Sequence, residues 1–319
     1  MLDRAFTDAN AWRGAELAPG AGHFTVAASV TDELTNATAE LAANPLPLAA
    51  LRPDQIYMPA TQALMAEVKK TLTKGIGFAL IDRLPLGSTG EDGARMLFWL
   101  MGSMIERPVA QNWGGDMIYD VTDTGRQPGN GTRPDKTSAE QNFHTDNSYN
   151  LCTPNFVGLL CLRGAKAGGT SHIVSLKAAH NALRDTNPKL LKRLYSPFYF
   201  DRQREHAPND AMTFSHPLFV ENDGELLARL SKFQVINGQQ LAGKPLDAAG
   251  VEALDALEEA MSAPGMDVSF QFEPGQIQFL NNRVIGHRRT RFTDWPEGNR
   301  KRLLVRLWLR DQGRPFYNG

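Results

Sequence analysis

The stretch Leu303-Leu-Val-Arg-Leu-Trp-Leu-Arg310, near the end of the 319-residue chain, has the alternating pattern of a β-strand. Its odd-numbered positions are all branched apolar residues, whereas its even-numbered positions include Arg306, Trp308 and Arg310. Successive side chains of a strand point to opposite faces of the sheet, so one face should cover a core and the other should offer polar groups. A strand so late in the chain must pair with strands near residue 150, which predicts long-range sheet pairing.

Other segments predict the remaining elements by their apolar spacing and their glycine and proline boundaries. Strands are expected at residues 75–82, 117–121, 155–162, 171–175, 268–272 and 276–280, and helices at residues 31–43, 61–72, 91–105, 176–195 and 250–262. This set favours a mainly β fold with peripheral helices (α+β), arranged as a double-sheet jelly roll.

The chain should form a single domain over residues 1–319, because it has no internal repeat and no low-complexity linker. Residues 1–55 are expected to pack on the core as an N-terminal extension. Residues 112–142 are rich in Gly, Asp, Thr and Pro, which is typical of a functional lid loop, and residues 197–216 are expected to form a surface insertion.

Composition narrows the class of partner. The 34 Lys and Arg residues nearly cancel the 35 Asp and Glu residues, so global charge argues against a nucleic-acid partner. No apolar run is long enough to span a bilayer and the start has no signal-peptide core, which predicts a cytoplasmic protein without a membrane partner. Cys152 and Cys161 lack CxxC spacing and are expected in the core. The oligomeric state is left open, a homo-oligomer included.

The triplet His144-Thr145-Asp146, with His287 far downstream, offers two imidazoles and one carboxylate. This set holds one face of a non-haem Fe(II) and leaves the opposite face open for a chelating co-substrate and O2. If the triplet lies in a strand, His144 and Asp146 point to one face and Thr145 points away. A His-x-Asp triplet alone is common, and the distal His287 strengthens the prediction that this triplet binds a metal.

An anion site is expected beside the metal. A dicarboxylic keto acid that chelates iron leaves its distal carboxylate needing a buried, bidentate cation, which favours arginine over lysine. Arg302 and Arg306 share a strand face and are the candidates, with a hydroxyl from Thr170 or Ser171. Residues 283–310 contain nine basic and two acidic residues, but without interleaved surface aromatics this segment is not typical of a nucleic-acid site.

Over residues 75–311 the sequence resembles the taurine dioxygenase superfamily of Fe(II)/2-oxoglutarate-dependent oxygenases, which includes clavaminate synthase and γ-butyrobetaine hydroxylase. Five segments carry the resemblance: Phe143-His-Thr-Asp146, Gly168-Gly-Thr-Ser171, Pro274-Gly-Gln-Ile-Gln-Phe-Leu-Asn-Asn282, the segment from His287 through Arg289-Thr290 and Phe292 to Asp294, and Arg302-Leu-Leu-Val-Arg306-Leu-Trp308. The resemblance implies a distorted jelly roll, or double-stranded β-helix.

The resemblance also implies roles for individual residues. His144, Asp146 and His287 would hold iron, Arg302 would pair with the distal carboxylate of 2-oxoglutarate, and Ser171 would assist it. Arg306 matches a position that contacts the anionic group of the substrate in taurine dioxygenase. Arg302 is preferred over Arg300 because it shares strand parity with Arg306.

The implied reaction couples decarboxylation of 2-oxoglutarate to succinate with oxidation of an unactivated C–H bond in a small molecule. Because Asp146 is a carboxylate, hydroxylation is favoured over halogenation. Asn147, Tyr149, Asn282 and Arg306 are candidates for substrate contacts. The pocket arginines point to an amino acid or another acidic or zwitterionic metabolite.

Two other functions are compatible with the same residues. A cupin-like sensor would bind 2-oxoglutarate without turnover. A zinc hydrolase would use the same triad with a metal-bound water as the nucleophile. The zinc enzyme has no need for Arg302, which favours the oxygenase.

Overall fold

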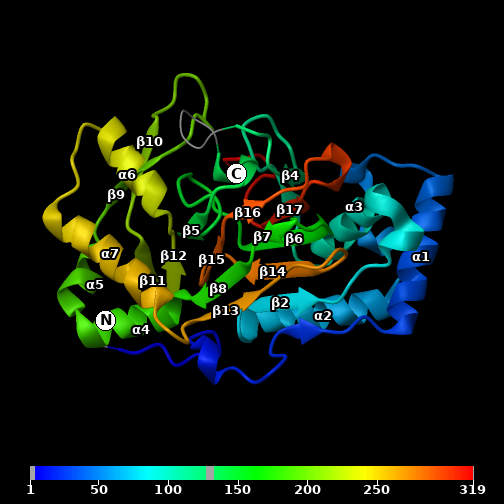
Figure 1. The fold of residues 1–319 in the computed structure, drawn as a ribbon, viewed down its shortest axis with the longest axis horizontal. Coiled ribbons are helices and arrows are strands. Elements are labelled where there is room, and N and C mark those ends of the chain that lie inside the picture. Colours follow the sequence, from blue (N-terminus) through cyan, green and yellow to red (C-terminus); the bar gives the residue numbers. More distant parts are fainter. Residues whose placement is uncertain (1–3, 127–132, 319) are drawn as a thin grey trace.

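The structure, a computed structural model, describes residues 4–126 and 133–318. Seven α-helices and seventeen β-strands lie within these residues (Figure 1). The helices are α1 (Ala28–Ala43), α2 (Pro59–Lys74), α3 (Leu86–Ile105), α4 (Leu176–Thr186), α5 (Pro188–Leu194), α6 (Lys232–Leu241) and α7 (Ala248–Ser262). The strands are β1 (His23–Phe24), β2 (Phe78–Ile81), β3 (Pro108–Val109), β4 (Tyr119–Val121), β5 (Gln141–His144), β6 (Phe156–Arg163), β7 (Ala167–Gly168), β8 (Ser171–Ser175), β9 (Phe198–Asp201), β10 (Thr213–His216), β11 (Phe219–Asn222), β12 (Glu225–Ala228), β13 (Asp267–Phe270), β14 (Ile277–Asn281), β15 (Ile285–Arg289), β16 (Phe292–Thr293) and β17 (Leu303–Leu309).

Two antiparallel sheets form the centre of the molecule. The larger has seven strands in the order β1-β2-β14-β6-β17-β3, with β4 also paired to β17, and only its β1–β2 edge is parallel. The smaller has four strands in the order β13-β8-β15-β5. Both sheets combine strands from the middle and the end of the chain. The long-range pairing expected from the sequence is therefore confirmed.

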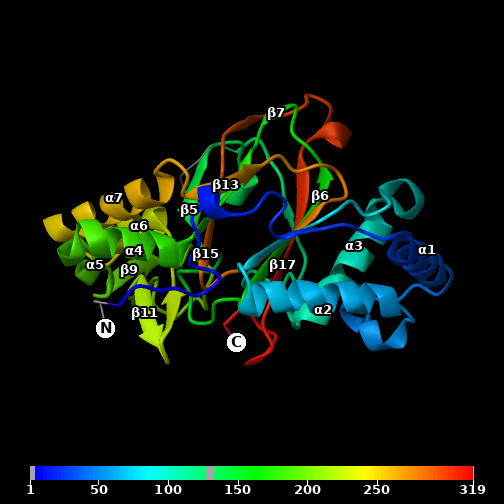
Figure 2. The same cartoon turned by 90° about the horizontal axis from the view of Figure 1, so that it is seen from below.

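Apolar side chains from the two sheets meet in one cluster. Phe78 and Leu280 of the larger sheet pack with Ile173 and Ile285 of the smaller one, and Trp12 from the N-terminal segment joins them. The other face of the larger sheet packs on α1, α2 and α3, and α4 to α7 lie beside the smaller sheet (Figures 1 and 2). The two sheets are thus enclosed between two groups of helices.

The alternation of β17 has the expected consequence. Leu303, Val305, Leu307 and Leu309 all belong to the core under α1 to α3, and β17 pairs with β6 along its length. Leu304 lies in a different cluster, with Cys161 of β6 and Leu80 of β2. The even-numbered face of β17 therefore points into the space between the sheets. Arg306 lies on this face.

Three expectations need correction. Helices account for more of the described residues than strands do, so the fold is mixed α/β and not mainly β. The helix expected at 176–195 is interrupted: Asn187 caps α5 by accepting a hydrogen bond from the Leu190 backbone N–H, and Pro188 cannot continue α4. Residues 197–216 are not simply a surface insertion, because Phe198 and Phe200 of β9 are fully buried.

Residues 5–55 reach both ends of the molecule. Phe6 packs in the core with α4 and α7, and the Trp12 indole N–H donates to the Ile76 carbonyl at 2.8 Å.

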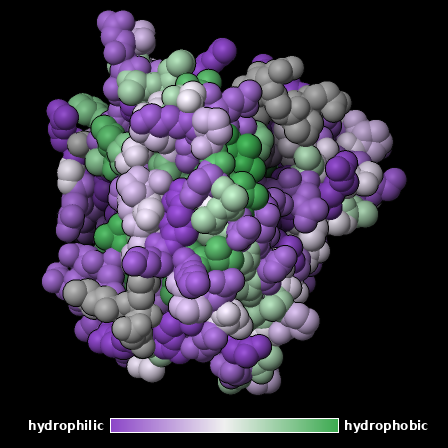
Figure 3. All heavy atoms as spheres, turned by 90° about the vertical axis from the view of Figure 1, so that its left-hand side faces the viewer, coloured by the Kyte–Doolittle hydropathy of each residue, from purple (hydrophilic) through white to green (hydrophobic). Residues whose placement is uncertain are grey.

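Within the described residues, no helix has the length and apolar character that crossing a membrane requires. On the face shown in Figure 3, hydrophobic residues lie in separate spots among hydrophilic ones. Phe233 and Ile236 of α6 are among the exposed large apolar side chains.

Candidate metal centre

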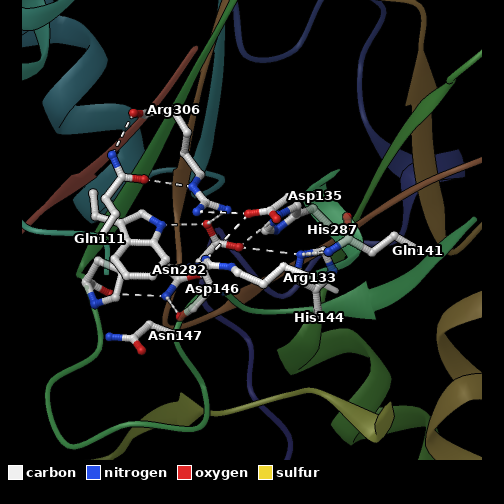
Figure 4. Close-up of polar contacts among 12 residues, drawn as sticks. Gln111, Arg133, Asp135, Gln141, His144, Asp146, Asn147, Asn282, His287 and Arg306 are labelled. Atoms are coloured by element: carbon white, nitrogen blue, oxygen red, sulfur yellow. Dashed lines mark hydrogen bonds and ion pairs between the residues drawn. The ribbon is translucent and has the colours of Figure 1, made fainter. Parts of the chain in front are cut away.

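Three side chains that could bind a metal meet where β5 and β15 pair. His144, the last residue of β5, is the direct cross-strand partner of His287 in β15, and their rings are 4.2 Å apart between centroids. Asp146 Oδ1 lies 3.4 Å from His144 Nε2 and 3.5 Å from His287 Nε2 (Figure 4). All three donor atoms lie within 4.8 Å of one another, which suits one shared ion.

Both imidazoles direct Nε2 toward the Asp146 carboxylate. His144 Nδ1 lies 2.9 Å from the Asn142 carbonyl, which favours a proton on that nitrogen and leaves the Nε2 lone pair toward Asp146, where the Gln141 amide lies 3.0 Å from it. Burial, with a further effect from His144, lowers the pKa of His287. A neutral imidazole is the form that binds a metal.

The placement of Asp146 differs from the expected strand, because β5 ends at His144. Thr145 still turns away from the donor atoms, and its hydroxyl accepts from the Leu230 N–H at 2.9 Å. Asp146 is held instead by Asn282, whose Oδ1 accepts from the Asp146 N–H at 2.8 Å and whose Nδ2 donates to the Asp146 carbonyl at 3.0 Å. The Asn282 side chain, and not strand geometry, therefore fixes the position of Asp146.

The two carboxylate oxygens of Asp146 face different partners. Oδ1 faces the imidazoles, whereas Oδ2 accepts from the Trp308 indole N–H at 2.6 Å and lies 3.3 Å from Arg306 Nη1. Burial alone would raise the pKa of Asp146, but Arg306 and the two histidines hold it well below its usual range. The carboxylate therefore stays ionised while it is almost completely buried.

Arg306 connects the centre to the loop before β5. Its Nε donates to Gln111 Oε1 at 2.8 Å, and the Gln111 Nε2 donates back to the Arg306 carbonyl at 2.7 Å. Its Nη2 lies 3.3 Å from Asp135 Oδ2, and Arg133 Nη2 lies 3.5 Å from the same oxygen. Figure 4 shows this chain of contacts leading from Gln111 to Asp146.

A cavity of about 220 Å³ opens beside the metal centre, and His144 and Asp146, but not His287, belong to its lining. It is lined by residues of the segment 133–149, by the start of α6, and by Gln203, Arg306 and Trp308. Asn147 and Tyr149, expected to contact substrate, belong to the lining, whereas Asn282 does not. Its amide is used by the Asp146 and Pro154 backbone, so the geometry favours a positioning role for Asn282.

Arg302 lies away from this cavity, just before β17. Its side chain is almost fully buried, and within the described residues Nη1 has no hydrogen-bond partner. Burial lowers the pKa of Arg302 to about 10, so the guanidinium is still charged at neutral pH. A Cβ added to Gly169 would lie 3.5 Å from Arg302 Nε, which shows that the segment leading to Ser171 passes beside this guanidinium.

Two hydroxyls were candidates to accompany Arg302. The Thr170 hydroxyl donates to Gln271 Oε1 at 3.2 Å, so it is already engaged. Ser171 is buried and stands opposite Arg289 in β15. Of the two hydroxyls, only that of Thr170 is therefore seen to donate to another side chain.

Sequence reasoning missed four residues around the centre, namely Gln111, Asp135, Gln141 and Trp308. The Gln141 amide lies 3.0 Å from His144 Nε2. Trp308 could have been found, because it shares a strand face with Arg306 two residues away. Gln111 and Asp135 come from irregular segments and carry no sequence signal of their own.

Two imidazoles on paired strands and a carboxylate from the loop that follows form the ligand set of a non-haem iron oxygenase, and the fold also holds a buried arginine, Arg302, whose Nη1 has no partner among the described residues. The sequence matches the family described as "Taurine catabolism dioxygenase TauD, TfdA family" over residues 45–308, and the chain belongs to this family. It is therefore an Fe(II)/2-oxoglutarate-dependent dioxygenase. The His-Asp-His donor set suits Fe(II), and the unpartnered Arg302 Nη1 suits a carboxylate of 2-oxoglutarate.

Relatives support the same fold and class. The chain is 29% identical to FR-33289 synthase of Streptomyces rubellomurinus (strain ATCC 31215) over 260 residues, which is 79% of this chain and 75% of that protein. Asparagine oxygenase in complex with Fe(II), (2S,3S)-3-hydroxyasparagine and succinate matches with a TM-score of 0.68 at 20% identity, covering 90% of this chain and 93% of that one.

Another solved structure shares the fold. The non-haem iron oxygenase OrfP, in complex with Fe, succinate and (3S)-hydroxy-L-Arg, matches with a TM-score of 0.67 at 16% identity. The match covers 91% of this chain and 94% of the OrfP chain. Both solved structures are complexes with a hydroxylated amino acid.

Proposed function

We propose that this dioxygenase hydroxylates an unactivated C–H bond of a small zwitterionic or acidic metabolite, such as an amino acid. His144, Asp146 and His287 hold the iron, and Arg302 with Ser171 holds the distal carboxylate of 2-oxoglutarate. The observation that carries the proposal is the convergence of three donor atoms within 4.8 Å of one another, two of whose residues, His144 and Asp146, line a cavity together with Arg306.

When bound, Fe(II) would activate O2, which is the oxidant, and 2-oxoglutarate would supply two of the four electrons that O2 takes up, the other two coming from the substrate C–H bond. The protein contributes position and protection. Asn282 fixes the Asp146 backbone, Trp308 and Arg306 fix its second oxygen, and the Asn142 carbonyl fixes the His144 tautomer. These contacts hold the donors in place before iron binds, which lowers the cost of assembling the centre.

Arg302 supports the co-substrate assignment. A buried guanidinium with a free Nη1 needs an anion, and within the described residues no carboxylate lies within ion-pair distance of it. A carboxylate can accept two parallel N–H bonds from arginine, and Ser171 can add a hydroxyl donor. The two facing sheets that carry these residues would form the distorted jelly roll that the sequence resemblance implies.

Arg306 supports the class of substrate. Its guanidinium lines the cavity together with that of Arg133, and the two solved relatives are complexes with hydroxyasparagine and hydroxyarginine. The proposal also keeps the expectations that the enzyme works in the cytoplasm on a small molecule, without a nucleic-acid or membrane partner. Asn147 and Tyr149 are the further proposed substrate contacts.

The test is a substrate screen with Fe(II), 2-oxoglutarate and O2. Amino acids, sulfonates and carboxylates are added singly, succinate release is measured, and mass spectrometry looks for one added oxygen. An Asp146→Ala protein is the control. The proposal fails if Asp146→Ala keeps full activity, or if no compound stimulates succinate release and gains oxygen.

A further inference from the structure

The segment 311–318, which follows β17, forms neither helix nor strand, yet it is held closely against the core. The Ala110 N–H donates to the Pro315 carbonyl at 2.9 Å. Arg107 and Arg310 donate to four more carbonyls of the segment, those of Asp311, Gly313, Arg314 and Phe316. These hydrogen bonds give the segment a fixed path without the help of regular structure.

This path places Tyr317 inside the protein. Tyr317 is 4% exposed, whereas Phe316 beside it is 63% exposed. The ring of Tyr317 stacks on the indole of Trp308, with 6.2 Å between the ring centroids and 20° between the ring planes. Burial, with a smaller effect from Tyr149, raises the pKa of Tyr317 well above its ordinary value, so its hydroxyl keeps its proton and acts as a donor.

The hydroxyl of Tyr317 binds Asn147, the residue directly after Asp146 (Figure 4). It donates to Asn147 Oδ1 at 3.2 Å, while Asn147 Nδ2 donates to the Cys152 carbonyl at 2.9 Å. Asn147 has a φ of 52°, in the left-handed region that residues other than glycine adopt only at a cost. Contacts around such a residue must hold it there, and Tyr317 supplies one of them.

The two contacts of Tyr317 converge on Asp146. Trp308, which stacks on the Tyr317 ring, donates to Asp146 Oδ2 at 2.6 Å. Asn147, which accepts from the Tyr317 hydroxyl, continues the backbone of Asp146. One side chain therefore supports both the residue that bonds the carboxylate and the residue that fixes the turn of the chain behind it.

We propose that Tyr317 is a positioning residue of the metal centre, whose ring supports Trp308 and whose hydroxyl fixes Asn147, so that Asp146 keeps Oδ1 directed at the metal. The segment 311–318 is then part of the oxygenase site and not only a cover of the core. This inference rests on the metal ligands named in the proposed function. It adds a residue that lies beyond the last strand.

A purely structural role does not account for the hydroxyl of Tyr317. A phenylalanine ring would fill the same space beside Trp308, Val109 and Val157. Burying a hydroxyl costs free energy unless the group forms a hydrogen bond, and here that bond goes to Asn147, which lines the cavity together with Trp308. The polar atom of Tyr317 is thus directed to the wall of the site.

The first experiment measures Co(II) binding to the full chain by calorimetry and by visible absorption, which depends on the geometry of the cobalt ligands. Tyr317→Phe removes the hydroxyl and keeps the ring. It should weaken Co(II) binding by about twofold to tenfold, the effect of one hydrogen bond, and change the visible spectrum. Tyr317→Leu also removes the stacked ring, and it should weaken binding by about tenfold to a hundredfold.

Tyr195→Phe is the matched control. The Tyr195 hydroxyl lies 2.9 Å from His180 Nε2, so this variant also deletes a bonded phenol hydroxyl, but away from the metal centre. It should leave the Co(II) affinity and spectrum unchanged. Urea unfolding is measured on every variant. If Tyr317→Phe lowers the unfolding free energy but keeps the wild-type affinity and spectrum, its role is structural and the inference is wrong.

A double-mutant cycle tests the route through Asn147. Asn147→Gly removes the amide that accepts from Tyr317, and glycine adopts the left-handed conformation at little cost. Adding Tyr317→Phe to Asn147→Gly should therefore weaken Co(II) binding no further. If Tyr317→Phe weakens binding equally with and without Asn147→Gly, the hydroxyl does not act through Asn147, and the inference is overturned.

Asp146→Ala separates this inference from the proposed function. If the wild-type protein does not bind Co(II), or Asp146→Ala binds it equally well, the proposed metal ligands are wrong and this inference falls with them. If Asp146→Ala loses Co(II) binding while both Tyr317 variants keep the wild-type affinity and spectrum, the metal ligands stand and only the role of Tyr317 is refuted.

Discussion

Arg306 Nη1 lies 3.3 Å from Asp146 Oδ2, the carboxylate oxygen that faces away from the two imidazoles. This contact joins β17 of the larger sheet to the ligand loop that follows β5 of the smaller sheet. Trp308, two residues further along β17, donates to the same oxygen. One strand therefore both stabilises a metal ligand as an anion and reaches the substrate cavity.

Trp308→Phe should weaken metal binding. The substitution keeps an aromatic ring against Tyr317 but removes the indole N–H that holds Asp146 Oδ2. Loss of such an outer contact typically costs about tenfold to a hundredfold in metal affinity. Mn(II) binding measured by calorimetry checks this. Trp99→Phe, a buried tryptophan in α3, is the control, and an unchanged affinity in Trp308→Phe would contradict the assigned role.

Asn282→Ala should lower both metal affinity and stability. It leaves the buried N–H and carbonyl of Asp146 without their side-chain partner, which costs about 1–3 kcal/mol for an unsatisfied buried group. Urea unfolding and Mn(II) titration measure the two effects. Asn281→Ala, which removes a contact to the Leu72 carbonyl, should lower stability alone. A changed substrate KM with normal metal affinity would instead support a substrate contact.

The sequence was informative where side-chain type and strand alternation agree. The pattern from Leu303 to Arg310 predicted β17 and the inward direction of Arg306. His144 and His287 were predicted to share a metal although they lie far apart in the sequence. The strand that carries His287 was missed, because Ile285-Gly-His-Arg-Arg289 contains a glycine and three basic or polar residues. Its place in the sheet comes from pairing with β8 on one side and β5 on the other.

Other parts of the site depend on contacts that leave no local pattern. Asp135 lies in the loop 112–142, whose composition predicted a functional lid but did not indicate which of its residues would act. Residues 127–132 of that loop lie outside the described residues. Asn282 was one of the candidates for a substrate contact. Only the fold shows that its amide is used by the Asp146 backbone.

Arg302→Lys should weaken 2-oxoglutarate binding by at least about tenfold while metal affinity stays normal. Lysine keeps the charge but loses the bidentate geometry that a carboxylate prefers. Calorimetry with 2-oxoglutarate and the Mn(II)-loaded protein measures the change. Arg300→Lys is the matched control two residues earlier, since Arg300 is about half exposed and pairs only loosely with Glu297 at 3.8 Å. If Arg300→Lys had the larger effect, the assignment of Arg302 would be wrong.

His180 should make the protein acid-sensitive. It is buried against Phe6 and Phe219, and its Nε2 lies 2.9 Å from the Tyr195 hydroxyl. Burial, helped by Arg184, lowers the pKa of His180 to about 4, against 6.5 for an ordinary histidine. Between these values the unfolded chain binds a proton that the folded chain does not bind. Acid therefore favours unfolding in this range.

The predicted loss attributable to His180 is about 2 kcal/mol of unfolding free energy between pH 7 and pH 5, and the stability is recovered as the pH rises. Other groups titrate in the same range, so the comparison is with His180→Gln, which can still bond Tyr195 but carries no titratable proton. Urea unfolding at both pH values gives the difference. Between pH 7 and pH 5, the unfolding free energy of the variant should fall by about 2 kcal/mol less than that of the wild-type protein. Equal pH dependence in the two proteins would show that His180 is protonated in the folded state.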